Sequence, residues 1–176
     1  MQKLKNEELN RLSLDEFKKA VKIPLIVVLD NVRSLHNVGS VFRTADAFLV
    51  EKICLCGITG TPPNKEIYKT ALGATESLAW QYHKNTIDCI LELKAQGYKI
   101  AAVEQAIGSV FLNNITWDKT KLVLIFGNEV NGVDEEVMKH IDYCIEIPQF
   151  GSKHSFNISI SAGIVLWQLL GNTEFL

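Results

Sequence analysis

The loop at 127–132, with the sequence GNEVNG, follows the apolar run LVLIF and combines residues that often hold a ligand. Its glycines, Gly127 and Gly132, have the spacing that opens a phosphate-binding P-loop. The next residues are Val133 and Asp134, where a P-loop requires a lysine for the phosphates and a hydroxyl for magnesium. Walker-type phosphate cleavage is therefore excluded, and this loop must serve another ligand or a turn.

Two other stretches gather glycine with polar side chains. The first, at 31–48, contains Asn37 and Arg43; the second, at 149–163, contains Ser155. Glycine allows the backbone to approach a ligand closely, and amide, guanidinium and hydroxyl groups supply directional hydrogen bonds. Three such stretches in one chain indicate a composite ligand site.

Each of these residues also has a plain structural interpretation. Asp134 and Asn157 could cap helices, and Arg43 could join a surface ion pair. Caps and turns do not require a repeated set of asparagine, arginine, glutamate and serine, so we favour the ligand site. The fingerprints of dinucleotide-binding proteins, zinc proteases and serine hydrolases are absent from the sequence.

Short apolar runs alternate with helical patterns along the chain. Strands are predicted at 25–30, 52–56, 77–83, 99–104, 122–126 and 144–148, and helices at 40–48, 66–72, 85–97, 134–140 and 156–170. This alternation predicts a single α/β domain, residues 23–176, with a mostly parallel sheet covered by helices on both faces. Residues 1–22 are predicted to form a short helical extension that ends before Pro24. Ligands bind at the carboxyl ends of parallel strands, where all three polar stretches lie.

The composition limits partners and compartment. The 176 residues are 47% hydrophobic with a net charge of −2, so RNA would have to be held by a local basic patch. Four cysteines show no metal-like spacing; we expect buried, reduced thiols, no metal and a cytoplasmic location. The uncharged stretch 155–173 carries too many polar side chains for a membrane span, and it is predicted to be a buried helix.

The three polar stretches resemble the motifs of the SPOUT superfamily of RNA methyltransferases, in its TrmH-like (SpoU) branch. The first motif corresponds to Asn37-Val38-Gly39 and Arg43-Thr44-Ala45, and the second to Phe126-Gly127-Asn128-Glu129 with Gly132. The third corresponds to Ile147-Pro148, Gly151, Ser155-Phe156-Asn157, Ser159 and Ala162, with phenylalanine where leucine is commoner. Order and spacing agree over about residues 25 to 170.

The resemblance implies methyl transfer from S-adenosylmethionine to an RNA ribose 2′-hydroxyl, a homodimer and a C-terminal trefoil knot. Implied cofactor contacts are Ile125, Gly127, Asn128, Gly132, Ile147, Pro148, Phe156 and Asn157. Implied catalytic residues are Arg43, Asn37, Glu129, Ser155 and Asn157. Predicted RNA contacts, which would form a basic rim, are Arg33, His36, Arg43, Lys153 and His154.

Arg43 has two possible roles. Relatives are described as using this arginine to remove the hydroxyl proton, but a guanidinium stays protonated in proteins. We expect it to grip an RNA phosphate and orient the hydroxyl, and in a homodimer to serve the partner's site. The last helix, with Ile164 and Trp167, would form the interface, or those side chains could belong to the core.

The RNA substrate and the activity itself leave alternatives open. We favour tRNA over rRNA, because relatives that act on rRNA often carry a separate N-terminal RNA-binding domain. One alternative is a protein that binds S-adenosylmethionine and RNA without catalysis, as a modification reader or assembly factor. Another is a flavodoxin-type nucleotide-binding protein, which would leave the third polar stretch unexplained.

Overall fold

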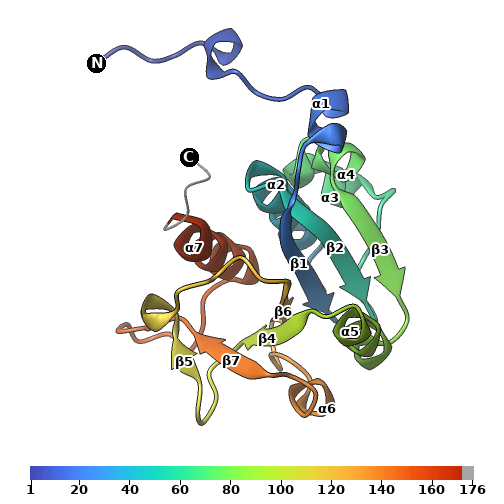
Figure 1. The fold of residues 1–176 in the computed structure, drawn as a ribbon, viewed down its shortest axis with the longest axis vertical. Helices are drawn as coiled ribbons and strands as arrows, with labels where there is room; N and C mark the ends of the chain where they lie inside the picture. Colours follow the sequence, from blue (N-terminus) through green and yellow to red (C-terminus); the bar gives the residue numbers. More distant parts are fainter. Residues whose placement is uncertain (172–176) are drawn as a thin grey trace.

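A parallel sheet of seven strands forms the centre of the molecule (Figure 1). The computed structural model describes residues 1–171. The strands are β1 Ile23–Asp30, β2 Val50–Cys56, β3 Ala79–His83, β4 Lys99–Val103, β5 Val110–Phe111, β6 Leu122–Phe126 and β7 Tyr143–Glu146. Their order is β3-β2-β1-β6-β4-β7-β5, and every neighbouring pair is parallel. The predicted α/β class is confirmed.

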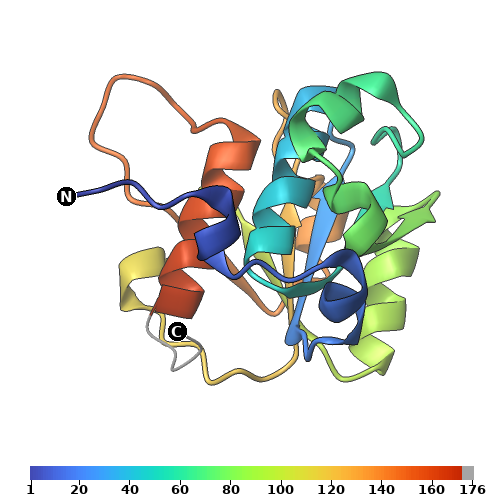
Figure 2. The ribbon, with the colours of Figure 1, turned by 90° about the horizontal axis from the view of Figure 1, so that it is seen from above.

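Helices cover both faces of the sheet (Figures 1 and 2). They are η1 Asn6–Leu9, α1 Leu14–Lys19, α2 Leu35–Ala47, α3 Lys65–Ala71, α4 Ala74–Ser77, α5 Thr86–Ala95, η2 Leu112–Asn114, α6 Glu135–Met138 and α7 Ile158–Gly171. Alternate residues of β1 enter two separate cores, because successive side chains of a strand point to opposite faces. One core lies under α2, α3 and α7, and the other under α5 and α6.

Helix α2 begins at Leu35, five residues before the predicted start at Ser40. Ser34 caps it, and the Ser34 hydroxyl accepts a hydrogen bond from the backbone N–H of Asn37 at 3.2 Å. Asn37 therefore lies on a helix, not in the predicted loop. Gly39 is also helical and faces α3, where an added Cβ would lie 2.3 Å from the Ile67 carbonyl oxygen. Glycine at this position lets α2 and α3 pack closely.

Two other local predictions need correction. Helix α1 ends at Lys19, and Pro24 lies inside β1, at an irregularity in the pairing with β2 between Ile23 and Ile26. Proline has no backbone N–H to donate to a neighbouring strand. It is tolerated at this position because the pairing of β1 with β2 is already irregular there. The short strand β5 was not predicted, because both of its residues are exposed and show no apolar alternation.

The end of the described chain is only partly as predicted. Helix α7 buries Ala162, Val165 and Leu166 against the sheet but leaves Ile160 and Trp167 exposed, so one side of it is not core. No helix within residues 1–171 is both long and apolar enough to cross a membrane. Strand β7 enters the sheet between β4 and β5. The trefoil knot stays a prediction, because strand order alone does not trace how the chain is threaded.

Candidate functional site

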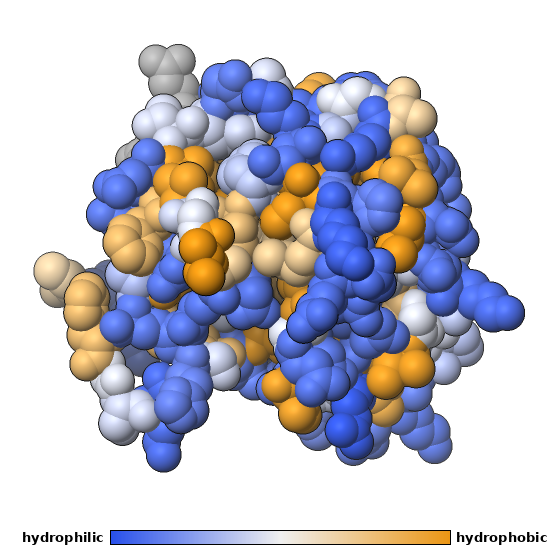
Figure 3. Space-filling view, turned by 90° about the horizontal axis from the view of Figure 1, so that it is seen from below, coloured by the Kyte–Doolittle hydropathy of each residue, from blue (hydrophilic) through white to orange (hydrophobic). Residues whose placement is uncertain are grey.

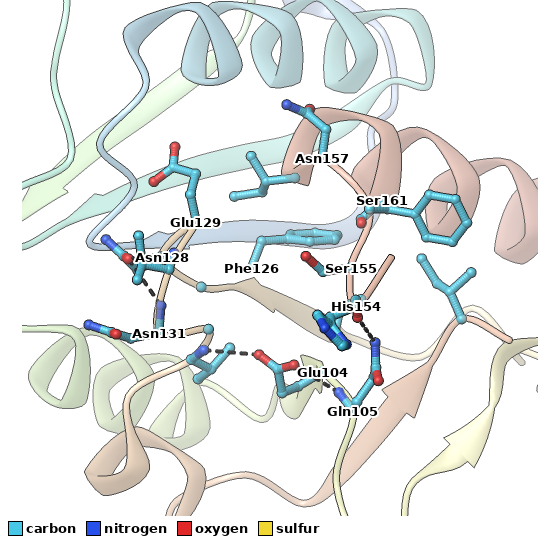
Figure 4. Close-up of a pocket in the computed structure, with 18 of the residues that line it drawn as sticks. Glu104, Gln105, Phe126, Asn128, Glu129, Asn131, His154, Ser155, Asn157 and Ser161 are labelled. Carbon is cyan, nitrogen blue, oxygen red and sulfur yellow. Dashed lines mark hydrogen bonds between the residues drawn. The ribbon is translucent and has the colours of Figure 1, made fainter. Parts of the chain in front are cut away.

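A cavity of about 630 Å³ lies at the carboxyl ends of β4, β6 and β7, beside the start of α7 (Figure 4). Its volume is in the range of small-molecule and cofactor sites. Its lining combines Val103, Glu104, Gln105, Phe126, the loop 127–133, Ile147, Gln149, the segment 154–158 and Ser161. Because parallel sheets bind ligands at the carboxyl ends of their strands, the cavity lies where the fold predicts a ligand. On the side at which β1, β2 and β3 end, the surface is mostly hydrophilic with separate apolar patches (Figure 3).

The loop 127–132 is held by its own backbone. Asn128 N–H donates to the Gly132 carbonyl at 2.8 Å, and Gly132 N–H donates to the Asn128 carbonyl at 2.9 Å. The Asn128 side chain accepts from Val130 N–H and donates to the Asn31 carbonyl at 2.8 Å. A Cβ on Gly127 would lie 2.1 Å from the backbone carbon of Gly132. The P-loop spacing of these glycines therefore reflects close approach of the two ends of the loop, not phosphate binding.

A chain of hydrogen bonds joins the three motifs. The Asn157 side-chain amide donates to Asn37 Oδ1 at 3.0 Å, and the Asn37 amide donates to Glu129 Oε1 at 3.1 Å. The Glu129 carboxylate also accepts from the backbone N–H groups of Arg33 and Ser34, at 3.0 and 2.9 Å. Three of the predicted catalytic residues are thus brought together. Their side chains hold the motifs against one another, so part of their role is to shape the cavity.

The environment of Glu129 favours its charged form. Partial burial opposes ionisation, but the hydrogen bonds from the backbone of Arg33 and Ser34 and from Asn37 outweigh it and lower the pKa of Glu129. A lowered folded-state pKa means that the carboxylate stabilises the fold above its unfolded pKa, near 4.5. This contribution is lost as the pH falls through the folded-state pKa.

We predict that Glu129→Gln destabilises the protein at neutral pH but not in acid. Glutamine keeps one acceptor oxygen and loses the other, so we expect a loss of about 1 kcal/mol at pH 7. Below the folded-state pKa of Glu129 the wild-type carboxyl is protonated, and the two proteins should be nearly equal. Urea unfolding at pH 7 and at a series of falling acid pH values measures this, with Glu76→Gln, at an exposed glutamate of α4, as the control. A difference that is the same at every pH would contradict the assignment.

The third motif contributes both a helix start and free ligand groups. Asn157 Oδ1 accepts from the Ser159 backbone N–H at 2.9 Å and from the Ser159 hydroxyl at 2.7 Å, so Asn157 both begins α7 and joins the first motif. Ser155 lines the cavity, and its hydroxyl makes no hydrogen bond within the described residues. Phe156 also lines the cavity and is 42% exposed. Ser155 and Phe156 are therefore available to a ligand.

Glu104 and Gln105 are among the cavity residues that were not predicted from the sequence. Glu104 Oε2 accepts from the Val133 backbone N–H at 3.2 Å, and Gln105 Nε2 donates to the His154 carbonyl at 2.6 Å (Figure 4). These contacts fasten β4 to the second and third motifs. The one signal in the sequence was their position at the carboxyl end of an apolar strand, predicted at 99–104, since no glycine or motif marks them.

Several predicted site residues lie outside the cavity. Neither Ile125, expected to contact the cofactor through its backbone, nor Pro148 is part of the lining, and the Ile125 side chain is buried in the core under α5 and α6. Of the predicted RNA contacts, His154 lines the cavity, while Arg33, His36, Arg43 and Lys153 are exposed outside it. His36 is paired with Glu66 at 2.9 Å, and Glu66 also binds Lys69. The residues of the predicted basic rim thus lie on several elements.

Comparisons with known proteins agree with this geometry. Residues 24–167 match the model of the SpoU rRNA Methylase family. The 23S rRNA (guanosine-2'-O-)-methyltransferase RlmB of Neisseria meningitidis is 32% identical over 81% of this chain and 56% of its own length. The tRNA (guanosine(18)-2'-O)-methyltransferase of Aquifex aeolicus is 32% identical over 82% of this chain and 67% of its own.

A solved structure shows the same fold. The AdoMet-bound rRNA methyltransferase from Sinorhizobium meliloti superimposes with a TM-score of 0.78 at 31% identity, covering 86% of this chain and 58% of that one. The chain described here therefore spans between about half and two-thirds of the length of these relatives.

Proposed function

Because this chain belongs to the SpoU rRNA methylase family, we propose that it transfers a methyl group from S-adenosylmethionine to a ribose 2′-hydroxyl of RNA. The observation that carries the proposal is the hydrogen-bonded chain from Asn157 through Asn37 to Glu129, which joins the three motifs beside one cavity. The two similar enzymes named above are both guanosine 2′-O-methyltransferases, one of rRNA and one of tRNA.

The cavity suits S-adenosylmethionine in size and in chemistry. Val103, Phe126 and Ile147 offer apolar surface for an adenine ring, and the Glu104 carboxylate offers acceptors for hydroxyl or ammonium groups. The cofactor has no phosphate, which agrees with a glycine loop that lacks a lysine. When bound, it supplies a methyl group on a positively charged sulfur.

The residues of this chain would act mainly by positioning. Methyl transfer requires the attacking oxygen, the methyl carbon and the leaving sulfur in line, and holding that geometry can supply much of the rate. The hydrogen bonds among Glu129, Asn37 and Asn157 fix the three motifs relative to one another beside the cavity. The Ser155 hydroxyl can receive or donate a hydrogen bond to the entering ribose. The proton of the attacking hydroxyl passes to water or to a neighbouring RNA phosphate.

We also propose that the protein acts as a homodimer through α7. Trp167 is 60% exposed on this helix, and Ile160, about two turns earlier on the same face, is also exposed. The Trp167 ring lies 6.4 Å from the Phe48 ring, at the end of α2. Helices α2 and α7 lie side by side (Figure 2), so an interface on α7 would bring the partner close to Arg43 on α2. Ile164, only half-buried, packs against the core and would contribute at the edge of the interface.

We predict that Trp167→Glu produces a monomer with little methyltransferase activity. A buried charge in an apolar interface is costly, and the site would lose the partner's arginine. Light scattering after size exclusion measures the mass, and methyl transfer measures the activity. Leu91→Glu is the control: Leu91 is 46% exposed on α5, on the opposite face of the sheet, and this variant should keep the wild-type mass. A Trp167→Glu protein that remains dimeric would rule out this interface.

For the substrate, we propose tRNA as the preferred RNA. The tRNA enzyme of Aquifex and the rRNA enzyme of Neisseria are equally identical to this chain, at 32%, so the comparisons favour neither RNA and a labelling assay has to decide. Transfer of labelled methyl from S-adenosylmethionine to unmodified tRNA and to rRNA fragments tests this. Label that makes one linkage of tRNA resistant to alkali would establish ribose methylation. Label in rRNA alone would reverse the preference. Cofactor and RNA binding without any transfer would support the reader or assembly-factor alternative.

A further inference from the structure

A cluster of soft metal-ligand side chains lies in the sheet, apart from the cavity. Cys54 lies in β2, His83 ends β3 and Cys89 belongs to α5. The two sulfur atoms and one ring nitrogen of His83 all lie within 4.8 Å of one another. Both cysteines are fully buried, and none of the three residues lines the cavity. Thiolates and imidazoles are the ligands that zinc takes in proteins.

The topology of the sheet produces this cluster. His83 is the register partner of Cys56 across the parallel β2–β3 pair, so the two side chains point to the same face. Cys54 is two residues before Cys56 in the same strand and shares that face. Helix α5 covers this face and contributes Cys89 to the same core. Cys56 therefore lies next to the cluster as a possible fourth ligand.

A second observation points to a ligand. The Nε2 atom of His83 is shielded from solvent and has no hydrogen-bond partner among the residues that the structure describes. Buried polar atoms in folded proteins are nearly always paired, so an unpaired imidazole nitrogen on a residue of this cluster requires an explanation. A cation bound through Nε2 of His83 together with Cys54 and Cys89 would pair this nitrogen and allow both sulfurs to ionise.

We propose that Cys54, His83 and Cys89 form a structural zinc site, with Cys56 or water as the fourth ligand. Two sulfurs at about 2.3 Å from a tetrahedral zinc are about 3.8 Å apart, so the observed limit of 4.8 Å closes with small side-chain rotations. Binding of Zn²⁺ releases the thiol protons to solvent and leaves the oxidation states unchanged. The ion ties the edge strand β3 to β2 and α5. This proposal departs from the expectation of no metal, which was drawn from the spacing of the cysteines. The proposed ligands come from three separate elements, so no short sequence motif could reveal the site.

The full-length protein, purified under reducing conditions without chelator, provides the first test. Elemental analysis should find close to one zinc per chain, and the melting temperature should fall when a chelator removes it. Titration of the metal-free protein with Co²⁺ should produce sulfur-to-cobalt charge-transfer absorption with the intensity of two or three thiolates. Absence of zinc together with absence of that absorption in the wild-type protein would overturn the proposal, whatever the variants do.

Variants assign the ligands. Cys89→Ser and His83→Gln should each weaken Co²⁺ binding at least tenfold. Cys144→Ser is the matched control, because Cys144 is a buried thiol that lies outside the cluster. It belongs to β7, and its S–H donates a hydrogen bond to the Glu104 carbonyl. Its cobalt spectrum and zinc content should match those of the wild type. Zinc retained in both Cys89→Ser and His83→Gln but lost in Cys144→Ser would show that other residues bind it. Methyl transfer does not enter this test, so its outcome is independent of the proposed function.

Discussion

Arg43→Ala is expected to lower methyl transfer at least about 100-fold while leaving the affinity for S-adenosylmethionine unchanged. Arg43 is exposed on α2 and does not line the cavity of its own chain, and its side chain makes no hydrogen bond or ion pair within the described residues. Its guanidinium stays protonated, so it suits gripping an RNA phosphate better than accepting a proton. Calorimetry with the cofactor and a labelled-methyl assay measure the two quantities. A parallel loss of cofactor affinity would place Arg43 in the cofactor site instead.

Arg43→Lys separates the two positioning roles. A single point charge can still hold a phosphate, so a gripping role predicts that the lysine variant keeps part of the activity. A role that depends on two parallel hydrogen bonds from the planar guanidinium predicts loss nearly as large as with alanine. Both variants should keep the wild-type mass and melting temperature, because the exposed Arg43 side chain has no hydrogen bond or ion pair to lose within the described chain.

Mixed dimers test whether the arginine serves the partner's site. Arg43→Ala is combined with Ser155→Trp, in which an exposed loop residue fills the cavity of its own chain. Each variant alone should be inactive. If Arg43 acts across the interface, a randomly mixed dimer has one complete site, and an equal mixture should recover about one quarter of wild-type activity. No recovery, with mixed dimers shown to form, would place Arg43 and the cavity in the same chain's site.

Gly127→Ala is expected to weaken S-adenosylmethionine binding by at least about 100-fold, because the new methyl group would overlap the loop itself. The added Cβ would lie 2.1 Å from the backbone carbon of Gly132 and 2.1 Å from the Val133 nitrogen. Backbone atoms cannot turn aside as a flexible side chain can, so the loop must open. Opening breaks the reciprocal Asn128–Gly132 hydrogen bonds and moves Val133 away from Glu104. Calorimetric titration with the cofactor measures the effect.

Gly151→Ala is the matched control for this substitution. Gly151 belongs to the third motif, but a Cβ there would meet no atom within 4 Å, and the residue does not line the cavity. Its cofactor affinity should remain within about twofold of wild type. If Gly127→Ala bound the cofactor as well as Gly151→Ala does, the closed form of the loop would not be the form that binds.

The sequence by itself determined the architecture and the location of the site. Strand and helix periods depend on neighbouring residues, so apolar runs such as LIVVLD and LVLIF identified the buried parallel strands. The carboxyl ends of those strands then placed the three polar stretches at one edge. The start of helix α2 was predicted wrongly, because the prediction relied on apolar spacing. The helix begins after its Ser34 cap and packs against α3 at Gly39, and neither serine nor glycine contributes to an apolar pattern.

Only the tertiary structure decided which side chains meet. Asn157, Asn37 and Glu129 are far apart in the chain, and their hydrogen bonds exist only because the sheet brings three loops to one edge. The same holds for Glu104, which has no motif of its own, and for the grouping of Cys54, His83 and Cys89. The exposure of Arg43 outside its own cavity was equally beyond local reasoning. The physical reason is common to all four: residue spacing encodes local conformation, whereas contacts between distant residues follow from strand order and register.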